Sequence, residues 1–233
     1  MNKIFNRTTL KYFAALAMVL DHTCMAFFSV FSPLGFAMRA VGRLTAPIMC
    51  MFLAEGFRYT SSKSKYAIRL GIFAIISQFS FAYFLNVSYF GGEYNVIFTF
   101  FLCFMMLWAS ENVQNPILKA LIVLLTAAVS YQGDWAIVAP LWVAGFYYAK
   151  TTVQKVCAFS AGAVVHIIMQ AYTSLQIGWK FSYILWQLGV FLFIPILLLY
   201  KPKREKTTQF SKWFFYMFYP LHLAVLAVAQ RLL

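Results

Sequence analysis

The residues best suited to chemistry are four ionisable groups inside otherwise apolar stretches. Asp21 and His22 are adjacent in the first apolar stretch, and Arg39 and Arg43 lie in the second. An ionisable side chain in a membrane-length segment costs about 3 kcal/mol to insert, so each marks a candidate functional site. A histidine beside a carboxylate and near buried cations suits acyl transfer. The histidine takes a proton from the attacking group, and the cations stabilise the oxyanion that forms.

Helical geometry brings these groups together. Asp21 lies about 100° around the helix from His22, close enough to orient its ring. Arg39 and Arg43 are four residues apart on one face, and the short loop at Ser32-Pro33 makes the two stretches antiparallel neighbours. We therefore predict that Arg39 or Arg43 pairs with Asp21. Two interpretations stay open: a charge-neutralised structural pair, or a site whose surplus positive charge binds an anion or oxyanion.

Two further sets of residues extend this site. Lys11 and His22 are eleven residues apart, about three helical turns, so they share a face and His22 lies about 16 Å deeper. In the last apolar stretch, Tyr219 and His222 flank Pro220, which removes a backbone hydrogen bond and opens local polarity. We expect His222 and Tyr219 to form a second cluster that helps to place the acceptor of the reaction.

Composition excludes most other classes of protein. The chain has 233 residues, of which 63% are hydrophobic and 11% charged, whereas a soluble domain carries about 25% charged residues. This excludes a soluble globular enzyme, a disordered chain and a disulfide-stapled domain. No GxSxG, HExxH or glycine-rich phosphate loop occurs, so we predict no metal and no serine hydrolase, zinc protease or nucleotidyl chemistry. His166 has no acidic neighbour and is interpreted as structural.

The apolar stretches predict an all-α, polytopic transmembrane helical bundle in one domain, residues 1–233, with about nine spans. The expected spans cover 8–31, 35–57, 67–86, 94–110, 117–132, 134–149, 152–171, 181–200 and 211–231. The fifth and sixth are short and tightly joined, so they can also form one re-entrant pair. Either choice leaves the orientation of the later spans unchanged.

The basic residues predict the orientation of the bundle. The formal net charge is +13, and most Lys and Arg residues fall at alternate ends of the spans, which the positive-inside rule assigns to the cytoplasm together with the N-terminus. Topology therefore explains the charge, and no nucleic-acid partner is expected. Five of the cations are candidates to bind the phosphates of a cofactor, although anionic lipid also explains such groups: Lys11, Arg58, Lys63, Lys65 and Arg69.

The sequence resembles the TraX family over essentially its whole length. The resemblance rests on Leu10-Lys11, Asp21-His22, Gly42-Arg43, Ala46-Pro47, residues 55–60, Gly133-Asp134-Trp135 and residues 212–223. It implies an inner-membrane acetyltransferase with acetyl-CoA as the acyl donor, acting on the N-terminus of a conjugative pilin. The Lys11-x10-His22 spacing is also similar to the Arg/Lys-x10-His signature of membrane-bound O-acyltransferases that modify surface polysaccharides. In those relatives the histidine is catalytic, which points to His22.

Together these observations give one working hypothesis. Acetyl-CoA binds from the cytoplasmic side of the bacterial inner membrane, and His22 acts as general base, oriented or charge-balanced by Asp21. Arg39 and Arg43 stabilise the oxyanion, and the acceptor is a pilin or a surface polysaccharide. The competing class is a small proton-coupled transporter or flippase in which the same groups relay protons or bind an anion. Release of free CoA that depends on an acceptor separates the two classes.

Overall fold

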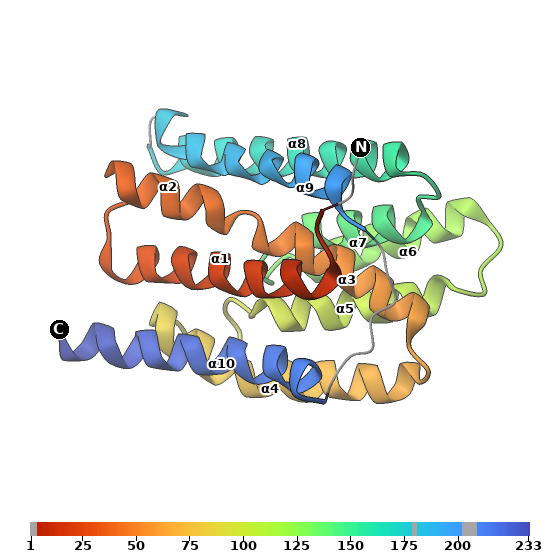
Figure 1. Ribbon diagram of the computed structural model, residues 1–233, viewed down its shortest axis with the longest axis horizontal. Helices are drawn as coiled ribbons and strands as arrows, with labels where there is room; N and C mark the ends of the chain where they lie inside the picture. Colours follow the sequence, from red (N-terminus) through yellow and green to blue (C-terminus); the bar gives the residue numbers. More distant parts are fainter. Residues whose placement is uncertain (1–3, 179–180, 202–208) are drawn as a thin grey trace.

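The computed structural model describes residues 4–178, 181–201 and 209–233. Within these residues the protein is an all-helical bundle whose helices run along one long axis (Figure 1). The helices are α1 (Arg7–Phe27), α2 (Pro33–Gly42), α3 (Thr45–Tyr59), α4 (Lys63–Leu85), α5 (Val96–Ser110), α6 (Pro116–Val129), α7 (Val138–Tyr148), α8 (Thr152–Gln176), the 3₁₀ helix η1 (Phe181–Leu192), α9 (Phe193–Leu199) and α10 (Gln209–Leu232). The predicted fold class is confirmed.

Short polar residues determine where several helices begin. The side chains of Asn95 and Asn115 accept hydrogen bonds from the first backbone N–H groups of α5 and α6. Thr151 and Gln154 form a capping box at the start of α8. Such caps satisfy N–H groups that have no partner within the helix. The expected spans therefore begin close to these polar residues in the folded protein.

The second expected span, 35–57, is interrupted. Helix α2 ends at Gly42 and α3 begins at Thr45, so Arg43 and Leu44 lie between them. Pro47 has no N–H to donate to the carbonyl of Arg43 four residues earlier, and this missing bond places the break there. Arg39 lies in the last turn of α2, and Arg43 caps this helix and donates its backbone N–H to the carbonyl oxygen of Arg39. The two arginines therefore keep the predicted spacing of four residues on one side of α2.

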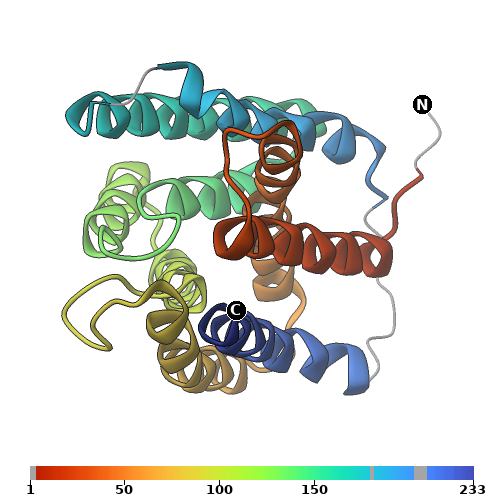
Figure 2. The same ribbon diagram turned by 90° about the vertical axis from the view of Figure 1, so that its left-hand side faces the viewer.

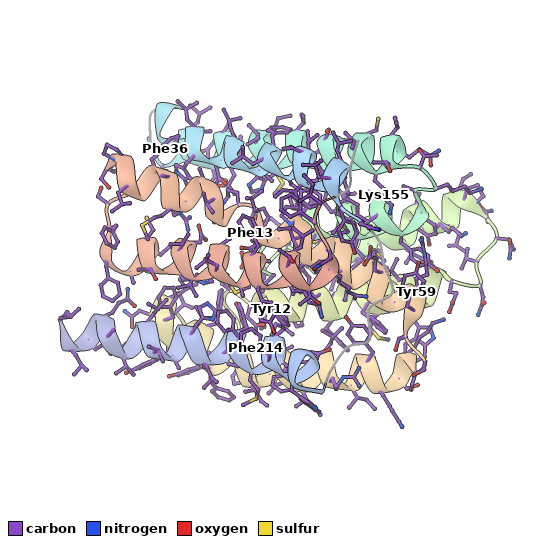
Figure 3. All side chains as sticks on the ribbon, in the orientation of Figure 1. Tyr12, Phe13, Phe36, Tyr59, Lys155 and Phe214 are labelled. Atoms are coloured by element: carbon purple, nitrogen blue, oxygen red, sulfur yellow. The ribbon has the colours of Figure 1, made fainter. Side chains whose placement is uncertain are left out.

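Most helices begin or end near one of the two ends of the bundle's long axis (Figure 1). At the right-hand end in Figure 1, Lys63 at the start of α4 pairs with Glu111 after α5, and Arg58 of α3 donates to the carbonyl oxygen of Tyr147 of α7. Tyr59 and Lys155 also lie toward this end, whereas Phe36 and the C-terminus lie toward the other (Figures 1 and 3). We call the first the basic end.

Three layers build the bundle. Helices α8, η1 and α9 cover one side, α4 and α10 cover the opposite side, and α1, α3 and α7 lie between them (Figure 2). Tyr12 of α1 meets Phe214 of α10, with 5.5 Å between ring centroids (Figure 3). Large fully buried side chains, such as Trp142, Phe57 and Phe104, form the core. Of α6, Ala127 alone is buried, so its remaining apolar surface suits contact with lipid.

Among the described residues, five helical segments are long and apolar enough to cross a membrane, and the protein is therefore a multi-pass membrane protein. These segments are 7–27, 33–59 with α2 and α3 taken together, 63–85, 152–176 and 213–232. The apolar helices 96–110, 116–129 and 184–199 are shorter, and α7 has 11 residues. Helix length alone therefore does not show the expected nine full spans. The number of crossings and the side of the N-terminus stay predictions.

Helices α6 and α7 form a hairpin whose turn lies inside the bundle. Tyr94, just before α5, donates its N–H to the carbonyl oxygen of Gln132 at 2.8 Å and accepts from the N–H of Asp134 at 2.7 Å. Trp135, in this turn, contacts Arg43. Arg43 follows the ten-residue helix α2 and therefore lies about 15 Å along that helix from the start of α2. Both helices therefore enter and leave at the basic end. Irregular backbone at this depth is tolerated where it is buried in protein or lines a cavity.

Candidate active site

A cavity of about 720 Å³ lies between α1, α2, α4, α5, α8, α10 and the α6–α7 turn. Its polar lining comes from seven helices or connections and includes Asp21, His22, Arg39, Arg43, Glu93, Asp134, His166, Gln170 and Tyr219. Five of the residues predicted from the sequence are in this lining. The structure therefore joins groups from the first two apolar stretches and from the last one in a single site.

An ion cluster of Asp21, Arg39 and Arg43 forms one wall of the cavity. Oδ2 of Asp21 lies 2.6 Å from Nη2 of Arg43 and 2.9 Å from Nη1 of Arg39. Each of these side chains is 15% exposed or less. The predicted pairing is confirmed, and it involves both arginines at once. One carboxylate and two guanidinium groups give the cluster itself one surplus positive charge, and the carboxylates of Glu93 and Asp134 also line the cavity.

Gly42 allows α1 and α2 to approach closely enough for this cluster. A Cβ atom on Gly42 would lie 2.3 Å from Oδ1 of Asp21 and 2.4 Å from its Cβ. Because these distances are far below van der Waals contact, the carboxylate of Asp21 can only lie against α2 where no side chain is present.

Two indole rings cover the guanidinium groups. Cζ of Arg43 lies 4.9 Å from the ring centroids of both Trp135 and Trp186, and Cζ of Arg39 lies 4.3 Å from that of Trp186. Such cation–π contacts stabilise a cation that is withdrawn from water. Trp135 has a left-handed backbone with φ of 57°, rare for a bulky residue. This backbone places its ring between Arg43 and His166, whose ring is stacked on it at 4.8 Å.

Sequence reasoning missed both tryptophans as members of the site. Trp186 lies in an apolar run, where a tryptophan is more typical of a membrane interface or a core. Trp135 belongs to the Gly133-Asp134-Trp135 segment of the family resemblance, so a signal for it was present. Asp134, in the same segment, was not predicted as a site residue either.

His22 and His222 are in direct contact. Nδ1 of His22 lies 2.9 Å from Nε2 of His222, and Nδ1 of His222 lies 2.9 Å from the carbonyl oxygen of Phe218. Phe218 stacks on the ring of His222, and Phe84 packs edge-on against His22. Asp21, although adjacent in sequence, has its carboxylate in the ion cluster. The hydrogen bond that fixes the ring of His22 therefore comes from α10.

A chain of amide and imidazole groups lies beside Trp135, on which the ring of His166 stacks. Nε2 of His166 lies 3.0 Å from Oε1 of Gln187, whose Nε2 donates to Oε1 of Gln170 at 3.1 Å. His166 is buried but still lines the cavity. The hydrogen bonds agree with the structural interpretation of this histidine, while its position adds it to the site.

Comparison with known proteins identifies the family. The sequence model of one family, described as TraX protein, matches residues 6–230. The chain belongs to the TraX family. The matched region contains every cavity residue of this TraX protein, from Met18 to Tyr219.

A curated relative of this TraX protein comes from Dichelobacter nodosus and is named as a probable fimbrial assembly protein, FimC of serogroup H1. It is 28% identical over 242 residues, which cover 98% of this chain and 97% of the relative. No solved structure matches the chain. The resemblance expected from the sequence is thus confirmed at the level of the family.

The cations predicted to bind cofactor phosphates are outside the lining of the cavity in this TraX protein: Lys11, Arg58, Lys63, Lys65 and Arg69. Lys63 pairs with Glu111, and Lys65 is exposed. Arg69 lies twelve residues, about 18 Å, along α4 from Phe81, which lines the cavity. A ligand that contacts both groups must therefore be long and extended.

Proposed function

We propose that this protein is an integral acetyltransferase of the bacterial cytoplasmic membrane. It moves an acetyl group from acetyl-CoA to an acceptor, either a pilin N-terminus or a cell-surface glycan. The observation that carries the proposal is the position of His22. Its Nδ1 is held by His222, Nε2 makes no hydrogen bond to the described residues, and the ring lines the cavity beside Arg39 and Arg43.

These residues suit the two proton transfers of acyl transfer. The thioester supplies an activated acetyl carbonyl. Nε2 of His22 accepts the proton of the acceptor's attacking nitrogen or oxygen as that atom bonds to the carbonyl carbon. Arg39 and Arg43 stabilise the negative charge on the former carbonyl oxygen. His22 then returns the proton to the departing sulfur, so that free CoA and the acetylated acceptor leave and the imidazole is restored.

Unpaired donors in the site support a ligand with a developing negative charge. Buried atoms with no hydrogen-bond partner among the described residues include Nε of Arg43 and Oη of Tyr219. A buried donor without a partner costs about 1–3 kcal/mol, and a substrate oxygen can offset that cost. The cavity is also large enough for the ends of two substrates, since ligand sites span about 300–1,000 Å³.

Acetyl-CoA, the acyl donor, would enter the bundle from the basic end. Arg58, Lys65 and Arg69 could hold the phosphates there, while the acetyl end reaches His22 through the bundle. This assignment needs a ligand that spans the distance of about 18 Å along α4. The name of the Dichelobacter relative, a probable fimbrial assembly protein, favours a pilin acceptor over a glycan.

The purified protein in lipid vesicles tests the function directly. We expect release of free CoA from acetyl-CoA when a synthetic pilin N-terminal peptide or a surface-polysaccharide fraction is added, with acetate recovered on that acceptor. The two arms identify the acceptor class. A transporter or flippase would release no CoA in either arm, and that result would contradict the proposal.

A further inference from the structure

The contact between His22 and His222 bears on which ring nitrogen of each histidine carries a proton, as well as on the orientation of the rings. The ring of His222 is held on three sides: Nδ1 lies 2.9 Å from the carbonyl oxygen of Phe218, the ring of Phe218 stacks on it at 5.0 Å, and Nε2 lies 2.9 Å from Nδ1 of His22. His222 itself is outside the lining of the cavity, so it lies behind His22 as seen from the substrate side.

The hydrogen-bond partners determine which nitrogen carries each proton. A carbonyl oxygen only accepts, so Nδ1 of His222 must be the donor in its bond to Phe218. In a neutral His222 the proton is then on Nδ1, and Nε2 is a bare acceptor. The facing nitrogen, Nδ1 of His22, must therefore donate. A neutral His22 is left with its lone pair on Nε2.

The charges around the pair favour neutral rings. The nearby ion cluster has a surplus positive charge, because Arg39 and Arg43 share one carboxylate. A protonated imidazole at His22 would add a third cation next to them. The carboxylate of Asp21 is also bound by both arginines and makes no hydrogen bond to His22, so α1 offers no alternative acceptor for its Nδ1–H.

We propose that His222 is a positioning residue that fixes His22 in the Nδ1-protonated tautomer, with the basic Nε2 facing the cavity. It does so through a chain of two hydrogen bonds, a relay that runs from the carbonyl oxygen of Phe218 through the ring of His222 to Nδ1 of His22. This role replaces the placement of the acceptor that the sequence suggested for His222. The inference rests on the proposed function only where it concerns activity, because the tautomer is a property of the protein alone.

The chain is well suited to a direct test because it contains three histidines. Magic-angle-spinning ¹⁵N NMR of protein labelled at histidine, in lipid bilayers, reports which ring nitrogens carry protons. His166→Asn assigns the third ring. We expect Nδ1 of His22 to be protonated and Nε2 bare in the wild-type protein. In His222→Phe, which keeps a ring against Phe218 but has no acceptor, the proton should move to Nε2 of His22.

A matched pair of variants links the tautomer to activity. In His222→Gln the amide oxygen can take the place of Nε2 and accept from His22, so the tautomer and most of the CoA release should remain. His222→Phe should lose about 100-fold or more in acceptor-dependent CoA release, the class of loss that follows when a catalytic histidine adopts the wrong tautomer. Leu221→Phe is the control for added bulk, because Leu221 directly precedes His222 in α10 and is exposed at the lipid-facing surface.

The outcomes separate this inference from the proposed function. A bare Nδ1 on His22 in the wild type, an unchanged tautomer in His222→Phe, or equal losses in His222→Gln and His222→Phe would overturn the positioning role. Ring shifts as expected, together with no CoA release by the wild type, would contradict the acetyltransferase proposal and leave the relay supported.

Discussion

At the scale of single residues, Asp21 and His22 are neighbours in the chain with separate partners. The 100° step of the helix turns Asp21 toward Arg39 and Arg43 of α2 and its end, and His22 toward His222 of α10. Under the proposed function, these two consecutive residues have separate roles: Asp21 balances the charge of the arginine pair, and His22 is the base. Each can be changed without removing the partner of the other.

Asp21→Asn tests the charge balance. It leaves two buried guanidinium groups without a carboxylate, and we expect a loss of about 3 kcal/mol or more in the free energy of unfolding. Denaturant unfolding in detergent measures the change. Addition of Arg39→Gln should recover part of the loss, because it removes one of the two unpaired cations. An Asp21→Asn variant that is as stable as the wild type would contradict the charge-balancing role assigned to Asp21.

Tyr219→Phe separates a substrate contact from a structural one. The hydroxyl is buried and has no hydrogen-bond partner among the described residues, so its removal should leave the thermal stability unchanged or slightly higher. If the hydroxyl binds substrate, CoA release should fall by about 10-fold, as expected for the loss of one hydrogen bond worth about 1.4 kcal/mol. Lower stability with an unchanged rate would instead assign Tyr219 to the core.

At the scale of helices, the site depends on how closely α1 and α2 pack and on where α2 stops. Gly42 permits the close approach, and Pro47 interrupts the helix just after Arg43. At the end of α2, both arginines contact the same carboxylate oxygen of Asp21. The α6–α7 turn adds Trp135, so two helices (α1 and α2) and two connections (the α2–α3 break and the α6–α7 turn) build the wall.

Gly42→Ala tests the helix contact. The new methyl group would overlap the carboxylate of Asp21, and we expect a loss of about 1–3 kcal/mol in stability together with reduced CoA release. Gly71→Ala in α4 is the matched control. Its Cβ would meet Phe101 at an ordinary distance of 3.5 Å, and alanine is the better helix former by up to about 1 kcal/mol. Equal effects at the two glycines would contradict the close-approach argument.

At the scale of the whole molecule, the fold places the base near one end and most of the predicted phosphate-binding cations at the other. Because α6 and α7 return to the end from which they start, they do not change which side the later helices face. The orientation predicted from the basic residues is therefore the same whether or not this pair counts as two spans, and it stays a prediction.

Reporter fusions test that orientation. A phosphatase that is active only outside the cytoplasm should be active when fused after Leu233 and inactive when fused at Asn112, between α5 and α6. The reverse pattern would place the basic end outside, and acetyl-CoA from the cytoplasm could then not reach it as proposed.

Much of the architecture was predictable because local chemistry determines it. Apolar length and polar caps such as Asn115 and Thr151 mark helix boundaries, and the cost of buried charge singled out Asp21, His22 and the two arginines. The depth of the α6–α7 turn and the contacts of Trp186 and Gln187 were not predictable. They depend on which helices become neighbours, and neither apolar length nor spacing encodes that.

The most direct test of the account replaces the base and keeps its hydrogen bond. In His22→Asn the amide nitrogen can still donate to Nε2 of His222, so the fold should persist, but no group remains to accept a proton in the cavity. We predict that the purified variant unfolds at the same temperature as the wild type and that its acceptor-dependent release of CoA falls by about 100-fold or more. A variant that releases CoA at the wild-type rate would contradict the central claim that His22 is the catalytic base.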